Sequence, residues 1–166
     1  MGSFAGKTAV VVGMGRGRTL GYGVARAFAE NGANVVLVGR SASGLKAVAS
    51  ELVLKVERND EPAIVSAVHD AVEAFGTIDV VVNCMQVAKS GMPVNELGLS
   101  DLDLALDTGV KAAFCWMKAC YPHLRDSRGC ILNFVSRAGR EGRCGQAPLA
   151  VSKEALAPSR SVLPSK

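Results

Sequence analysis

A run of glycines follows the first apolar segment and is the clearest chemical signal in the chain. Residues 8–12 are mostly β-branched, and Gly13, Gly15, Gly21 and Gly23 come between them and a helical pattern. Glycines at a strand-to-helix turn let the backbone approach a ligand, and the first N–H groups of the helix attract an anion. The pattern predicts a site for the pyrophosphate of a dinucleotide. A glycine-rich turn that binds nothing is the alternative.

The residues after the second apolar run bear on which dinucleotide binds. An acidic side chain at that place would bind the adenosine ribose and favour NAD, but the sequence reads Gly39, Arg40 and Ser41. A guanidinium pairs with a 2′-phosphate or stacks on adenine, and Arg16 and Arg18 in the glycine-rich stretch add positive charge. We therefore predict NADP(H) as the preferred cofactor and NAD(H) as the alternative. Solvated surface arginines would also account for this pattern.

Short β-branched runs alternate with longer helical patterns along the chain. Strands that are apolar on both faces and separated by helices are typical of a parallel sheet covered on both sides. We expect an α/β fold, a Rossmann-type doubly wound parallel sheet of five to six strands. The expected strands are residues 8–12, 34–38, 53–57, 78–82 and 130–135, and the expected helices are residues 22–31, 43–52, 62–75 and 102–124.

The length of 166 residues suits one domain. We expect a single NAD(P)-binding Rossmann domain over residues 1–156. Residues 157–166 contain Pro158, Pro164 and three serines, and prolines do not continue a helix. We therefore expect an irregular tail there.

Residues 7–156 resemble the short-chain dehydrogenase/reductase family. The spacing from Gly13 to Gly21 is wider than the usual family pattern, and residues 19–25 are similar to its divergent enoyl-reductase branch. The resemblance implies an oxidoreductase that uses NAD(P)(H) to interconvert a carbonyl and an alcohol on a small molecule.

The resemblance also implies cofactor contacts after the third and fourth strands. Glu57 and Arg58 stand where the family has residues near the adenine, and Asn83 begins a segment in which the family usually has Asn-Asn-Ala-Gly. Here that segment ends in Met85 and Gln86. These side chains are bulkier than the usual ones, so we expect them to crowd the nicotinamide ribose.

Four catalytic groups are implied by the resemblance: a tyrosine, a lysine four residues later, a serine thirteen residues before the tyrosine, and an asparagine on the long helix. Ser136 and Lys153 lie in segments that resemble the serine and lysine segments, with Lys153 also at the nicotinamide ribose. The tyrosine position is Leu149, and the asparagine position is Gly109. Loss of a general acid typically costs about 10² to 10⁴ in rate.

Two interpretations of function therefore stay open. One is an NADP-preferring oxidoreductase with impaired catalysis, and the other is a non-catalytic dinucleotide-binding pseudoenzyme or a truncated fragment. The resemblance implies further strands and a substrate-covering loop after the last residue, so we expect a C-terminally truncated fold in which strand five is an exposed edge. It also implies a homo-oligomer formed through the long helix, where Trp116 and Met117 would suit an interface or the core equally well.

Composition argues against other classes of function. The net charge of +4 comes without a basic block, so no nucleic-acid partner is expected. No apolar run is long enough for a membrane span, and residues 1–7 lack the layout of a signal peptide. His69 and His123 are far apart and no cysteine pair has metal-ligand spacing, so no metal is expected. Five unpatterned cysteines favour the cytoplasm.

Overall fold

The computed structural model describes residues 2–14, 19–39, 52–56 and 60–157 of the chain. Its strands are β1 (Thr8–Met14), β2 (Asn34–Gly39), β3 (Leu52–Lys55), β4 (Val80–Asn83) and β5 (Cys130–Asn133). Its main helices are α1 (Leu20–Glu30), α2 (Glu61–Phe75), α3 (Leu99–Leu106), α4 (Ala112–Ser127), α5 (Arg137–Glu141) and α6 (Ala147–Ala155), with a 3₁₀ turn η2 (Val94–Glu96) and a π-helical turn η3 (Asp107–Lys111).

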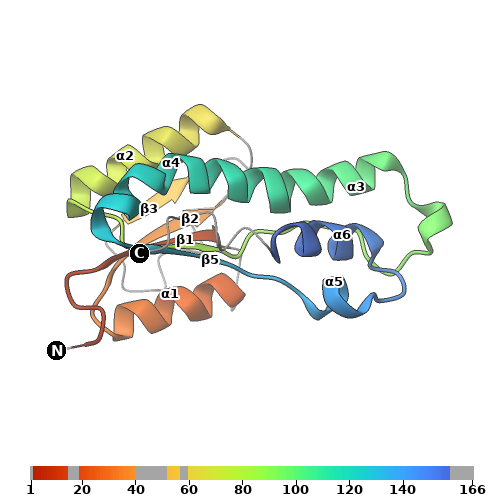
Figure 1. The fold of residues 1–166 in the computed structure, drawn as a ribbon, viewed down its shortest axis with the longest axis horizontal. Coiled ribbons are helices and arrows are strands. Elements are labelled where there is room, and N and C mark those ends of the chain that lie inside the picture. Colours follow the sequence, from red (N-terminus) through yellow and green to blue (C-terminus); the bar gives the residue numbers. More distant parts are fainter. Residues whose placement is uncertain (1, 15–18, 40–51, 57–59, 158–166) are drawn as a thin grey trace.

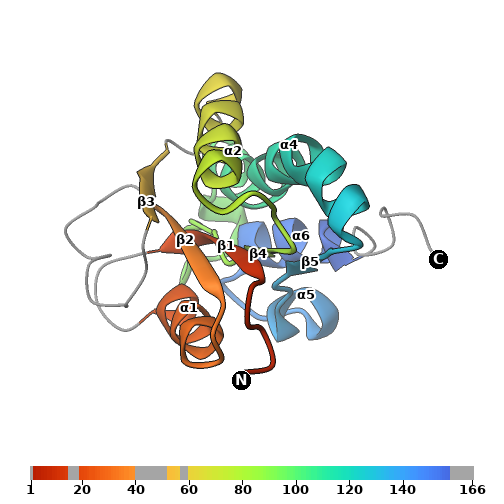
Figure 2. The ribbon, with the colours of Figure 1, turned by 90° about the vertical axis from the view of Figure 1, so that its left-hand side faces the viewer.

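The five strands form one parallel sheet in the order β3-β2-β1-β4-β5. Helices α2 and α4 cover one face, and α1 and α5 lie on the other (Figure 2). The predicted fold class, a Rossmann-type sheet with helices on both faces, is therefore confirmed. Because the chain leaves β1 towards β2 and returns on its other side to β4, the strand order reverses between β1 and β4, which is where α/β folds bind their ligands.

Alternate residues of each central strand supply two separate cores. On one face Val10, Val36 and Val81 pack with Ile64 of α2 and Trp116 of α4. On the other face the neighbouring strand residues pack against α1; they are Ala9, Val11, Val35, Leu37, Val80 and Val82, with Ala25 of the helix. Burial on both faces is why these strands read as continuous apolar runs.

A helical rod of three segments runs along one side of the molecule. Helix α3 passes through the π-helical turn η3 into α4, and the rod extends beyond the sheet over α6 (Figure 1). Gly109 lies inside the π turn and is buried. The predicted long helix over 102–124 is thus confirmed, but the observed one extends from Leu99 to Ser127. Its α-helical hydrogen bonding changes to a π-helical pattern at η3.

Several predicted bounds differ from those observed. Strand β3 begins at Leu52 and ends at Lys55, so the prediction of a strand over 53–57 was shifted. The predicted helix 43–52 cannot include Leu52, and its other residues lie outside the described ones. The predicted tail is described only at Ala157, and helix α5 was not predicted at all.

The placement of Trp116 decides one open alternative. Its side chain is 1% exposed and packs in the core between α4 and the sheet. Trp116 therefore cannot form an oligomer interface, and the interpretation as a core residue is the correct one.

Candidate cofactor and active site

A cavity of about 270 Å³ opens at the carboxyl ends of the strands, on both sides of the β1–β4 reversal. Three groups of residues line it. They are Val12, Gly13, Met14, Thr19, Leu20 and Gly21 around the β1–α1 turn; Val38, Gly39 and Val56 after β2 and β3; and Cys84, Met85, Gln86 and Val87 after β4, with Trp116 behind them.

Two glycines let the strand ends come together beneath this cavity. Gly13 has φ +100°, and a Cβ there would lie 2.6 Å from the Cα of Met85 in the segment after β4. A Cβ on Gly39 would lie 2.6 Å from the carbonyl oxygen of Met14. Both contacts are with backbone atoms that cannot swing away, so these positions require glycine for the observed packing.

The N-terminus of α1 contributes residues to the lining of the cavity. Thr19 caps the helix, since its hydroxyl accepts a hydrogen bond from Tyr22 N–H at 3.4 Å. Gly21 is buried and lines the cavity, and a Cβ there would lie 3.0 Å from Met14 Sδ. Gly23 lies two positions further along α1 on its exposed side, with open space around it, and does not line the cavity.

Five predicted cofactor residues lie outside the described residues. They are Gly15, Arg18, Arg40, Glu57 and Arg58. Their roles stay predictions from the sequence.

Asn83 ends β4 and is buried between strands. Its side-chain N–H donates to Oδ1 of Asn133, the residue paired with it on β5, at 2.7 Å. Its own Oδ1 has no hydrogen-bond partner among the residues that the structure describes. Asn83 thus ties β4 to β5 just before the cavity-lining segment. A contact with a cofactor stays a prediction.

Lys153 is 6% exposed on α6, close enough to Cys84 for their charges to interact. Burial lowers the pKa of the Lys153 ammonium, which Cys84 partly offsets. Burial also raises the pKa of the Cys84 thiol to about 11, although Lys153 opposes this. In the described part of the chain no carboxylate forms an ion pair with Lys153, so its amine is free for a polar ligand.

Ser136 follows β5 and caps the short helix α5, whose Ala138 N–H donates to its hydroxyl at 3.2 Å. Helices α5 and α6 pack so closely that a Cβ on Gly139 would lie 3.2 Å from the carbonyl oxygen of Ala150. Ser136 and Lys153 are therefore carried by neighbouring helices. Neither lines the cavity itself.

Leu149 stands one helical turn before Lys153 on α6 and is half-buried. It carries no proton that it could donate. The two tyrosines are elsewhere, because Tyr22 packs in α1 against the sheet and Tyr121 is exposed towards the end of α4. The exposed thiol of Cys144 lies in the turn between α5 and α6.

A polar cluster that the sequence did not reveal lies where the loop after β4 meets the long rod. Thr108 Oγ accepts from Val87 N–H at 2.9 Å, and the Gln86 side chain donates to the carbonyl of Ala105 at 3.1 Å. Ser152 Oγ lies 3.1 Å from Gln86 Oε1. The only signal for this cluster was the presence of Gln86 where the resemblance implies glycine.

Comparison with known proteins decides the family. Residues 7–161 match the family described as short chain dehydrogenase. The chain belongs to that family. This membership confirms the resemblance found in the sequence. The family implies a dinucleotide cofactor, and the cavity lies where the fold would hold it.

The relatives include several dehydrogenases of small molecules. The chain is 34% identical to a 12alpha-hydroxysteroid dehydrogenase from Clostridium sp., over 94% of this chain and 65% of the relative. It is 32% identical to an L-fucose dehydrogenase from Oryctolagus cuniculus, over 92% of this chain and 55% of the relative. A structure of NAD+-bound xylitol dehydrogenase superposes with a TM-score of 0.84 at 26% identity, over 93% of this chain and 62% of that one. The chain therefore spans between half and two thirds of the length of these proteins.

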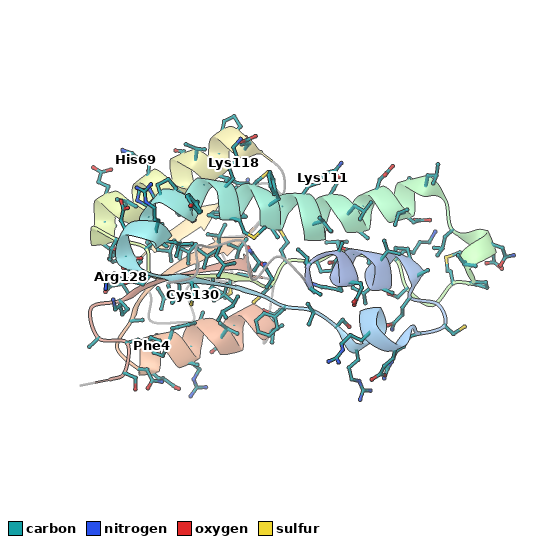
Figure 3. All side chains as sticks on the ribbon, in the orientation of Figure 1. Phe4, His69, Lys111, Lys118, Arg128 and Cys130 are labelled. Carbon is teal, nitrogen blue, oxygen red and sulfur yellow. The ribbon has the colours of Figure 1, made fainter. Side chains whose placement is uncertain are left out.

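No helix among the described residues combines the length and apolar character that a membrane span requires. On α2, one potential ligand atom from each of His69, Asp70 and Glu73 lies within 4.8 Å of the others. His69 lies on the outer side of α2 (Figure 3), and Glu73 is also exposed. Exposed groups of this kind are common on helices, and no second feature points to an ion.

Proposed function

We propose that this chain binds a nicotinamide dinucleotide in the cavity at the strand ends, with NADP(H) preferred over NAD(H). The observation that carries the proposal is the cavity itself. It lies at the strand-order reversal of a parallel sheet, with the N-terminus of α1 on one side and glycine backbone at its base. This is the place and the chemistry that a dinucleotide requires.

The lining residues divide the cavity into three parts. Gly13 and Gly21 allow the pyrophosphate to lie against the β1–α1 turn, where the helix N–H groups offset its charge. Gly39 and Val56 offer a wall for the adenosine half, and Cys84 begins the wall for the nicotinamide half.

The preference for NADP(H) rests on the sequence after β2. Gly39 is followed by Arg40 and Ser41, so no carboxylate is available there for an adenosine ribose. Arg40 and Arg18 would bind a 2′-phosphate through charge-assisted hydrogen bonds. Glu57 and Arg58 would border the adenine.

We further propose that the chain is an oxidoreductase of small carbonyl compounds or alcohols with impaired catalysis. The bound cofactor supplies the hydride chemistry. Lys153 would hold the nicotinamide ribose, and Ser136 would donate a hydrogen bond to the substrate oxygen. Leu149 leaves the proton donor missing, and Gly109 leaves a second group missing. A non-catalytic dinucleotide-binding protein is the second candidate, favoured by the same two positions.

Equilibrium binding and turnover measured on one preparation test this proposal. The purified chain is titrated with NADPH, then mixed with NADPH and a panel of small ketones, aldehydes and sugars, with the Clostridium enzyme assayed in parallel. We expect binding, with turnover about 10² to 10⁴ below the relative because a general acid is absent. Turnover equal to the relative would contradict the proposed impairment, and binding with no turnover would favour the second candidate.

Two further parts of the proposal concern the whole protein. We propose the cytoplasm as its location, because all five cysteines are free thiols. We also propose self-association through the long rod, where Phe114 is 61% exposed on α4. A covalent-label and mass measurement of the native protein, with Phe114→Lys as the variant, would test the interface.

A further inference from the structure

The Gln86 carboxamide joins three elements of the fold at one point. Its Nε2 lies 3.1 Å from the carbonyl of Ala105 on α3 and 3.3 Å from that of Val87, and its Oε1 accepts a hydrogen bond from Ser152 Oγ at 3.1 Å. Gln86 also lines the cavity. One side chain therefore connects the cavity wall after β4 to α3 and to α6.

Ser152 is the partner on α6, and it directly precedes Lys153. Its side chain is fully buried, and its hydroxyl lies 3.1 Å from Gln86 Oε1 and 2.9 Å from the carbonyl of Ala105. A hydroxyl has a single proton, so it donates to one of these oxygens at a time. Donation to the carbonyl of Ala105 holds α6 against α3, and donation to Gln86 Oε1 holds α6 against the loop after β4.

Gly109 provides the space that this arrangement needs. A Cβ at position 109 would overlap both Ser152 Oγ and Gln86 Oε1. The carboxamide of Gln86 therefore occupies the volume that a side chain at position 109 would need. With Gln86 and Ser152 in place, position 109 requires glycine.

Lys153 directly follows Ser152 on α6, so it lies next to this cluster along the chain. Lys153 is buried, and in the described residues no acidic side chain pairs with it, so its position follows from the packing of α6. Helix α6 is held to the rod by contacts with α3 and with the π turn, and the Ser152 hydrogen bonds lie in that contact.

We infer that Gln86 is a positioning residue, which sets the place of Lys153 relative to the dinucleotide cavity by holding Ser152 and the segment after β4 together. The inference deepens the proposed function and rests on it for the cofactor. The inference gives the bulky side chain at position 86 a positioning role, whereas the sequence suggested that it only crowds the site. The Gln86 carboxamide extends from the loop after β4 into the volume beside Gly109.

The experiment compares three variants, each of which loses side-chain hydrogen bonding inside the fold. Gln86→Met keeps the volume and removes the hydrogen bonds, and Ser152→Ala removes the hydroxyl. Ser127→Ala is the matched control, since Ser127 Oγ donates to the carbonyl of Ile78 at 2.8 Å, at the opposite end of the sheet. For each protein we measure the melting temperature, the dissociation constant for NADPH, and the pH dependence of Lys153 acetylation without nucleotide, read by mass spectrometry.

All three variants should melt below the parent protein, but only two should affect the site. In Gln86→Met and Ser152→Ala, the midpoint of Lys153 acetylation should rise towards that of an exposed lysine by about half a pH unit or more. NADPH should bind roughly three- to tenfold more weakly, which is the effect of one lost buried hydrogen bond. Ser127→Ala should leave both quantities unchanged.

A second pair of variants moves the carboxamide to the rod. Gly109→Asn alone should lower the melting temperature, because the new side chain overlaps Gln86. Combining it with Gln86→Gly opens the space and should restore the Lys153 midpoint towards that of the parent. This rescue separates positioning from simple loss of stability.

The inference is overturned if Gln86→Met lowers the melting temperature as Ser127→Ala does and leaves the Lys153 midpoint and NADPH affinity where they were. If the parent protein binds no NADPH, the proposed function fails. The acetylation midpoints are measured without nucleotide, so they would still decide whether Gln86 positions Lys153.

Discussion

Single residues at the β1–α1 turn determine how closely a ligand can approach the chain. Gly21 lines the cavity in the first turn of α1, whereas Gly23 lies two residues on in open space. The two glycines lie on the same helix, but Gly21 faces the cavity and Gly23 faces open space. They therefore form a matched pair for a test of the site.

We predict that Gly21→Ala weakens NADPH binding roughly tenfold and that Gly23→Ala leaves it unchanged. An added methyl at position 21 meets Met14 and stands beside the ligand, whereas at position 23 it only favours the helix, by about 0.5 to 1 kcal/mol. Fluorescence titration and thermal melting check both effects. Equal losses of affinity in the two variants would contradict this prediction and would support the cofactor contact that the sequence predicted for Gly23.

Lys153 links the site to the pH dependence of stability. Because burial lowers its pKa in the folded protein, Lys153 binds more protons in the unfolded chain between that lowered pKa and its ordinary pKa of 10.5. The contribution of Lys153 to stability therefore rises with pH across this window, and the full cost of its buried charge is present below it. The Cys84 thiol, with its pKa raised to about 11, stays neutral over most of the window.

We predict that Lys153→Met melts above the parent protein at pH 7 and that this difference shrinks as the pH approaches 10.5. Lys118→Met is the control of opposite sign, since Glu61 raises the pKa of the exposed Lys118 and its loss should not stabilise the fold. Melting temperatures of the nucleotide-free proteins across pH 7 to 10.5 give the result. A difference that stays constant or grows with pH would contradict a buried charged lysine.

The residue at position 149 limits what a single repair can achieve. Leu149→Tyr places a phenol one turn before Lys153, but Gly109 on the rod and Gln86 in the loop after β4 remain unchanged. We predict that this variant gains turnover yet remains well below the Clostridium relative in a steady-state assay with NADPH. Turnover equal to that of the relative from this one change would show that Gly109 and Gln86 do not matter.

At the scale of elements, the central strands were the most predictable part of the fold. Residues such as Val36 and Val81 are buried on a sheet with helices on both sides, so their runs carry no polar alternation and are easily recognised. Helix α2 was predicted almost to its ends, because Asp60 caps it, Pro62 lies in its first turn and Gly76 follows it with φ +76°.

The elements that the sequence missed are those with weak or distributed signals. Helix α5 is only five residues long, and its start depends on Ser136, which was considered as a catalytic residue and not as a cap. The π turn around Gly109 leaves no pattern in the sequence. The Gln86 cluster joins residues 86, 105 and 152, and contacts at such separations are set by the packing of α3 and α6.

Strand β5 forms one edge of the sheet and has an apolar surface. Leu132 on this strand and Val135, two residues after its end, are each 47% exposed. Cys130 at the start of the strand is also exposed (Figure 3). An apolar edge strand with free backbone groups is a template for pairing with another chain. The exposed edge expected from the sequence is present in the described fold.

We predict that Leu132→Lys reduces concentration-dependent association of the chain without lowering its melting temperature. A charge on an edge strand opposes edge-to-edge pairing, and the side chain is already half in solvent. Leu99→Lys is the control, since Leu99 is 80% exposed at the start of α3, away from the sheet edge. Light scattering over a range of protein concentrations measures the association of each variant. Equal effects of the two substitutions would contradict association through the edge strand β5.

At the scale of the whole molecule, the chain combines the strand-end cavity with a leucine at the position where the resemblance implies a catalytic tyrosine. The strand-end cavity, the α1 N-terminus and the glycine contacts are all present, whereas position 149 has no proton donor. The chain spans between half and two thirds of the length of its relatives. Dinucleotide binding is therefore the property on which the rest of the account depends.

The most direct test is a titration of the purified chain with NADPH and with NADH, following cofactor fluorescence and thermal stability together. We predict that NADPH binds more tightly and raises the melting temperature, because a ligand that binds only the folded state stabilises it. NADH should bind more weakly by the contribution of the 2′-phosphate. Equal affinities would contradict the role given to Arg40, and no binding of either nucleotide would contradict the central claim that this cavity is a working cofactor site.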